Sequence, residues 1–105
     1  MQVYYSDSKL AKLCTNEREM QRKRADIAPR LKLRIKALDV AQNVGELATI
    51  DPLGDWHELT ANWAGHWAGK LSANYRLVIR PEGASETWEA VTVTVIEITD
   101  YHQRR

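Results

Sequence analysis

The sequence predicts an α+β fold in which a short N-terminal strand and a two-helix hairpin pack on a mostly antiparallel sheet of four to five strands. In the first half, Leu31, Ile35 and Leu38 recur at the i, i+4 and i+7 spacing of a buried helix stripe. In the second half, residues 91–95 alternate valine and threonine, as strands do. Helical patterns followed by strand patterns are typical of helices packed on one face of an antiparallel sheet. The 105 residues contain no repeat or linker, so we expect a single domain, 1–105.

The N-terminal segment begins with a short, β-prone stretch at residues 3–5, after which Ser6 or Asp7 can cap a helix. An interrupted apolar stripe then predicts one helix from Ser8 to about Arg24.

The second helix of the predicted hairpin follows directly. Asp26 is its candidate cap, and Pro29 is tolerated in its first turn. We expect it to end near residues 41–45 and to be followed by a loop over residues 46–55.

The C-terminal half reads as a meander of strands at residues 56–59, 66–71, 75–80 and 90–102, joined by turns at 62–65, 72–74 and 81–85. The last strand is the longest. Its β-branched residues place Val91, Val93 and Val95 on one face and Ile96 and Ile98 on the other, together with Thr92 and Thr94. Both faces are therefore expected to be largely covered, with this strand in the interior of the sheet.

The net charge of +1 conceals an asymmetry along the chain. Residues 1–50 hold ten Lys/Arg against six Asp/Glu, whereas residues 51–105 hold five against eight. The basic residues concentrate between Lys9 and Lys36, which is consistent either with a polyanion-binding surface or with solvated helix faces. The single cysteine, Cys14, fits a reducing compartment. With no signal peptide and no apolar run of membrane length, we expect a soluble cytoplasmic protein with no membrane contact.

The residues suited to chemistry are dispersed. The three histidines lack ligand spacing and a cysteine pair, so neither a metal nor a cofactor is expected. His57, Arg76 and the run Asp100-Tyr101-His102 can supply an acid–base set and a guanidinium for a phosphate. Two alternatives stay open: Arg76 can be the structural partner of an acid such as Asp100, and the run can be a solvated tail.

These residues also carry a family resemblance. Asn74-Tyr75-Arg76-Leu77 and Ile98-Thr99-Asp100-Tyr101-His102 resemble two motifs of the RelE/ParE toxin superfamily, most closely its HigB-type branch of plasmid-maintenance killer toxins. The similarity covers roughly Leu31 to His102 and includes His57-Glu58-Leu59 and Gly65-His66-Trp67-Ala68. It implies the RelE-like microbial RNase fold. Members of this branch tend to be strongly basic, whereas this chain is nearly neutral.

The resemblance implies the toxin of a type II toxin–antitoxin pair, a ribosome-dependent endonuclease that cuts messenger RNA in the 30S A site. The reaction would be metal-independent, with the RNA 2′-hydroxyl attacking the adjacent phosphorus. By position, His57, Asp100, Tyr101 and His102 match the family's recognition and cleavage residues, and Arg76 matches its phosphate-contacting arginine. Which of His57, Asp100 and His102 is base and which is acid stays open.

Further RNA contacts are expected from Lys70, Asn74 and the run Arg22-Lys23-Arg24. The implied partner is a helix-turn-helix, HigA-like antitoxin, through which the pair would bind operator DNA. Two alternatives remain: a non-catalytic ParE-like topoisomerase inhibitor, and an attenuated toxin acting mainly as an antitoxin-binding partner.

Overall fold

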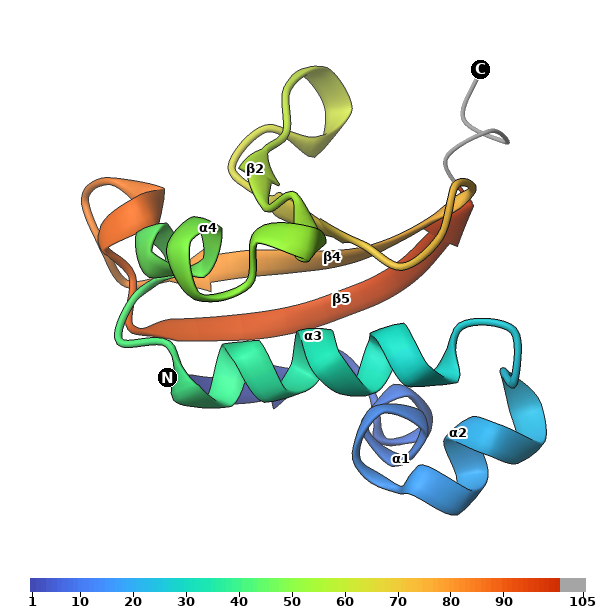
Figure 1. Cartoon of the computed structure of the whole chain (residues 1–105). Coiled ribbons are helices and arrows are strands. Elements are labelled where there is room, and N and C mark those ends of the chain that lie inside the picture. Colours follow the sequence, from blue (N-terminus) through green and yellow to red (C-terminus); the bar gives the residue numbers. More distant parts are fainter. Residues whose placement is uncertain (101–105) are drawn as a thin grey trace.

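A five-stranded sheet carries all the longer helices on one of its faces (Figure 1). The computed structural model describes residues 1–100 of the chain. The strands are β1 (Gln2–Tyr5), β2 (His57–Glu58), β3 (Trp67–Lys70), β4 (Tyr75–Glu82) and β5 (Thr92–Asp100), and their order across the sheet is β1-β5-β4-β3-β2. β1 runs parallel to β5, and every other pair is antiparallel. The predicted α+β fold is confirmed, with β5 in the interior between β1 and β4.

The three longer helices come first in the helical layer, α1 (Ser8–Thr15), α2 (Glu17–Lys23) and α3 (Ala28–Val40). The prediction of one helix from residue 8 to 24 is therefore wrong. Asn16 leaves the helical conformation, and its Oδ1 accepts a hydrogen bond from the Glu19 N–H at 3.0 Å, so it caps α2. The predicted cap at Asp7 is confirmed, because its Oδ1 accepts from the Leu10 N–H at 2.7 Å.

Two further expectations about the helices need correction. Asp26 does not cap α3, whose first residue follows Ile27 without a side-chain cap; the Asp26 carboxylate instead binds Arg24 at 3.1 Å. Pro29 does lie in the first turn, as predicted. The expected loop over residues 46–55 contains α4 (Leu47–Ile50), flanked by 3-10 turns at Val44–Glu46 and Pro52–Gly54. Two more such turns, Ala61–Trp63 and Thr87–Glu89, lie in the meander.

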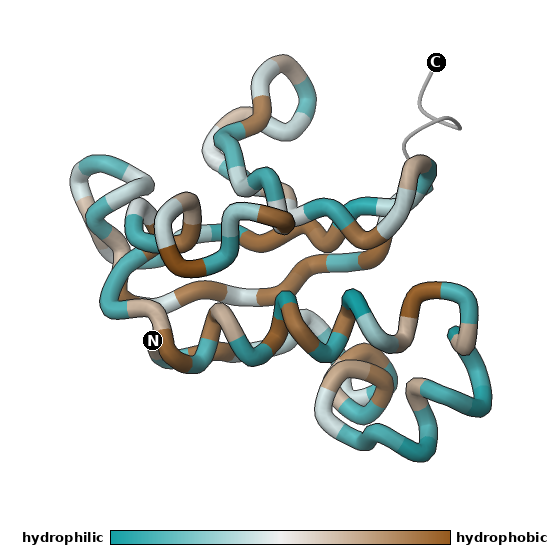
Figure 2. The backbone as a smooth tube through the Cα atoms, in the orientation of Figure 1, coloured by the Kyte–Doolittle hydropathy of each residue, from teal (hydrophilic) through white to brown (hydrophobic). Residues whose placement is uncertain are grey.

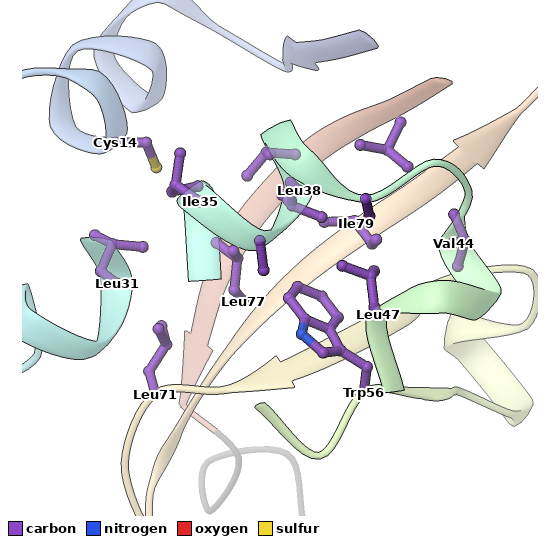
Figure 3. Close-up of a cluster of buried hydrophobic side chains, with 14 of the residues drawn as sticks. Cys14, Leu31, Ile35, Leu38, Val44, Leu47, Trp56, Leu71, Leu77 and Ile79 are labelled. Atoms are coloured by element: carbon purple, nitrogen blue, oxygen red, sulfur yellow. The ribbon is translucent and has the colours of Figure 1, made fainter. Parts of the chain in front are cut away.

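The core lies between the helices and the sheet (Figure 3). Leu31, Ile35 and Leu38 of α3 are buried in it, as their spacing predicts, against Leu77 and Ile79 of β4. In the hydropathy view, hydrophobic residues recur along α3 and the two long strands, whereas α2 is hydrophilic along most of its length (Figure 2). The burial of apolar side chains therefore fixes α3 more firmly than α2.

Trp56 completes the core at the edge of the sheet. Its indole ring lies over Gly69 of β3, where a Cβ would come within 2.7 Å of the ring carbons. Its Nε1 donates to Asp51 at 2.9 Å, which satisfies the one polar atom of the ring. Position 69 therefore requires a glycine, because the Trp56 ring lies too close to the backbone for any side chain.

Arg34 is a charged residue inside this packing. Its Nε donates to the Lys70 carbonyl at 2.7 Å, its NH1 group to Asp51 at 3.1 Å and its NH2 group to the Leu53 carbonyl at 3.0 Å. This one side chain joins α3, the 51–53 turn and the end of β3. None of the helices within residues 1–100 is long and apolar enough to cross a bilayer.

A β-bulge interrupts the alternation of β5. Val95 pairs with Ile79 and Glu97 pairs with Val78, so Ile96 is an extra residue on β5. Val93 and Val95 are buried, but Val91 precedes the strand and is exposed. Beyond the bulge, Ile98 packs against the same core, and its predicted position on the opposite face is therefore wrong.

Candidate functional site

The candidate site lies on the outward face of the sheet, opposite the helices, where β4 begins and β5 ends (Figure 1). Leu77 points into the core, so Arg76 points outward. The strand register places Lys70 and Thr99 on either side of Arg76, which makes one row across three strands. Two cations and a hydroxyl therefore face solvent together.

His57 lies on the same face in the adjacent row. It pairs with Ala68, which pairs with Val78, two residues beyond Arg76. At ideal sheet spacings, the Cα atoms of His57 and Arg76 lie roughly 12 Å apart. The structure thus brings together His57, Lys70 and Arg76, which the sequence analysis had singled out separately.

The Arg76 guanidinium is held at the β3–β4 turn. Its NH1 group donates to the Ser72 carbonyl at 2.7 Å and to the Tyr75 carbonyl at 3.1 Å. The Ser72 hydroxyl in turn accepts from the backbone N–H groups of Asn74 and Tyr75, at 3.2 and 3.0 Å. Asn74 is exposed at this turn. These bonds orient the guanidinium before any ligand arrives, which lowers the entropic cost of binding a phosphate.

The tautomer of His57 follows from its partner. Nδ1 lies 2.8 Å from the Asp55 carbonyl oxygen, which can only accept, so Nδ1 carries the hydrogen. In the neutral ring, Nε2 then carries the lone pair. The side chain is exposed, so this nitrogen can take a proton from a group bound on the outward face.

Asp100 is directed toward the other face. It pairs with Tyr75, which packs against the core on the helix side. Strict alternation from Val95 would have turned Asp100 outward with Arg76, and the bulge at Ile96 reverses this. Tyr101 and His102 lie outside the described residues.

The basic run Arg22-Lys23-Arg24 belongs to the helical layer, and its charges are engaged within the protein. Arg22 and Lys23 both bind the buried Glu19 at 2.8 Å. The hydrogen bonds from Lys23 and Arg22 lower the pKa of Glu19 to about 2. Arg24 binds Asp26 and lies 4.6 Å from the centre of the Tyr75 ring. The run thus offers less free positive charge than the sequence suggests.

Elsewhere on the outward face, charge is also balanced. Arg80 binds Glu82 at 2.9 Å, and the Thr94 hydroxyl donates to the same carboxylate. The hydroxyl and then Arg80 lower the pKa of Glu82. Lys70, by contrast, forms no ion pair within residues 1–100.

One functional candidate, Arg30, was missed by the sequence analysis. It lies at the start of α3 and lines a cavity beside the β3–β4 turn. Only the packing of α3 against the turn reveals it. Over the described part of the chain, no group of three or more His, Cys, Asp or Glu side chains is arranged to hold a metal ion.

The sequence matches no protein-family model and no curated protein. Solved structures do share its fold. A YoeB/ParE toxin from Agrobacterium tumefaciens superposes with a TM-score of 0.56 at 19% identity, covering 95% of this chain and 98% of that one. The YoeB-YefM complex from Staphylococcus aureus gives 0.59 at 13% identity, covering 94% of each chain. YafQ from E. coli strain BL21(DE3) gives 0.60 at 12% identity, covering 97% and 94%. The chain therefore has the fold of the RelE-like toxins.

Proposed function

We propose that this chain is the toxin of a type II toxin–antitoxin pair, of the HigB-type branch, and that it cuts messenger RNA in the ribosomal A site. The fold shared with YoeB/ParE and YafQ toxins supports the class. The motifs at residues 74–77 and 98–102 support the branch and the activity. The observation that carries the proposal is the shared outward face of His57, Lys70 and Arg76 at the end of the sheet.

The chemistry needs a base, an acid and a positive clamp. The base takes the proton of the 2′-hydroxyl, whose oxygen then attacks phosphorus, and the acid protonates the departing 5′-oxygen. The products are a 2′,3′-cyclic phosphate and a free 5′-hydroxyl. His57 Nε2 suits the base, and Arg76 suits the clamp for the charge that develops on the phosphoryl oxygens.

A protein partner belongs to this proposal. One of the structures with this fold is a complex, YoeB-YefM. We expect this chain to pair with a helix-turn-helix, HigA-like antitoxin that carries the pair to operator DNA. Because its target is the ribosome, we place the toxin in the cytoplasm.

The test is to induce the chain in cells and map messenger-RNA ends. Cuts in phase with codons are expected, and they should fall by roughly 100-fold or more in an Arg76→Ala variant, since one preorganised donor contributes about that much. His57→Ala and His102→Ala should also reduce cutting. Arg80→Ala is the matched control, because Arg80 lies on the same strand and face but is bound to Glu82. Cutting that survives Arg76→Ala, or falls equally in Arg80→Ala, would contradict the proposal.

Two other functions predict different results. A ParE-like topoisomerase inhibitor, suggested by the name of the Agrobacterium structure, would stall replication and leave messages intact. An attenuated toxin, suggested by the net charge of only +1, would not affect growth.

A further inference from the structure

A cavity of about 400 Å³ lies between α3 and the β3–β4 turn, around the edge of the sheet from Arg76. Arg30 and Leu33 contribute to it from α3, and Leu53 contributes from the 3-10 turn. Lys70 lines it from the end of β3 and Ser72 from the β3–β4 turn. Its volume is within the range of small-ligand sites.

The cavity carries excess positive charge. Arg34, at its base, is neutralised by Asp51. Arg30 and Lys70 form no ion pair with any described residue. Burial lowers the pKa of Arg34, and the nearby charge of Arg30 lowers it further, against the opposing effect of Asp51. A bound anion would relieve this repulsion.

The walls are fixed by the same backbone that holds the candidate site. Arg34 donates to the carbonyls of Lys70 and Leu53, at 2.7 and 3.0 Å, while Arg76 donates to the Ser72 carbonyl from the other side of the turn, at 2.7 Å. The segment 70–72 is therefore shared by the outward row and the cavity. Lys70, the partner of Arg76 in the outward row, also lines the cavity.

The rim is apolar. Leu33 and Leu53 are 55% and 78% exposed, although both are large aliphatic residues next to a cation. A ligand that combines negative charge with a flat apolar face would cover them while meeting Arg30 and Lys70. A nucleotide has both properties.

We propose that this cavity is a subsite for the RNA strand flanking the cut, in which Arg30 and Lys70 bind one phosphate and Leu33 and Leu53 cover the adjoining ribose or base. The subsite rests on the proposed function and extends it to the substrate beyond the scissile bond. An acidic protein segment has similar chemistry, but the shared segment 70–72 favours the ligand that also binds Arg76.

The test uses a 5′-labelled hexanucleotide with 2′-O-methyl groups, which cannot be cut because the attacking hydroxyl is blocked. Its affinity for the purified chain is measured by fluorescence anisotropy over a range of salt. Arg30→Ala and Lys70→Ala should each weaken binding roughly tenfold, as expected for a charge-assisted hydrogen bond, and should each lower the log–log salt slope by about 0.7.

Lys36→Ala is the matched control, because this substitution also removes one positive charge. Lys36 lies exposed on the same helix but lines a different pocket. If Arg30→Ala and Lys36→Ala lost the same RNA affinity, the loss would reflect the net charge of the protein rather than the cavity, and the proposal would be overturned. If the Arg30→Ala variant bound the RNA as tightly as the wild type but no longer bound a co-expressed antitoxin, the proposal would be overturned, and the cavity would be a surface for a protein partner. If the wild type binds this RNA at the cavity but cuts no messages, the proposed function fails while the subsite stands.

Discussion

Replacing Arg34 with methionine removes a charged group that the fold encloses, while its volume is largely kept. The Arg34 side chain is 3% exposed, and that of its partner Asp51 is 13% exposed. Among residues 1–100, the change leaves the Asp51 carboxylate with the Trp56 Nε1 as its only side-chain donor, and it takes donors from the carbonyls of Lys70 and Leu53.

The cost follows from which groups water can reach. The hydrogen bonds from Arg34 to the carbonyls of Lys70 and Leu53 are only partly buried, so water can replace the lost donors at small cost. Removing one partner of a buried ion pair lowers the free energy of unfolding by about 3–5 kcal/mol. Because Asp51 is partly exposed, we expect the lower end of this range, about 3 kcal/mol. For a domain of this size, that lowers the melting temperature by roughly 12–24 °C.

The assay is urea unfolding followed by circular dichroism, with Lys36→Met as the control on the exposed side of the same helix. The control should stay within about 0.5 kcal/mol of wild type. Arg34→Met combined with Asp51→Asn should cost less than the sum of the single changes, because the unpaired charge is gone. An Arg34→Met protein within about 1 kcal/mol of wild type would refute the view that this ion pair is structurally essential.

Two further expectations concern stability. Gly69→Ala should cost about 1–3 kcal/mol, because a Cβ there would lie 2.7 Å from the Trp56 ring and must displace it; tryptophan fluorescence during unfolding measures this, and an unchanged midpoint would contradict it. Glu19→Gln should be less stable than wild type at neutral pH, and the gap should close as the pH falls from about 5 to about 2. The carboxylate, with its pKa lowered to about 2, stabilises the fold above its ordinary pKa and loses that effect as it protonates. A gap independent of pH would show that the ion pairs of Glu19 do not stabilise the fold.

The elements that the sequence predicted well are those whose signal is local. The helical spacing of Leu31, Ile35 and Leu38 can be recognised without knowing what they pack against. The cap at Asp7 likewise involves a residue only three positions away. Asn16 was missed because the residues around it are compatible with a continuous helix. Its side chain bonds the backbone and ends the helix, and only the structure shows which of the two outcomes prevails.

Features set by distant residues could not be predicted in this way. The bulge at Ile96 leaves no mark in a run of β-branched residues, yet it decides which face Asp100 occupies. Arg34 is visible in the sequence as a cation on the buried stripe of α3. Its partner Asp51, however, lies in a segment that the sequence predicts to be a loop, so the ion pair could not be predicted. The shared face of His57 and Arg76 depends on the register of β2, β3 and β4, which is likewise non-local.

β1 and β5 lie side by side although they stand near opposite ends of the chain, and the Ser6 hydroxyl donates to the Ile96 carbonyl across a separation of 90 residues. At about 5–20 residues per second, a ribosome needs roughly 5–20 s to add that many. During this time β1 has no neighbouring strand, and β4 lacks β5, the strand with which it forms its longer ladder. The sheet can therefore be completed only after β5 has been made, and a chain that stops before β5 cannot present the assembled outward row.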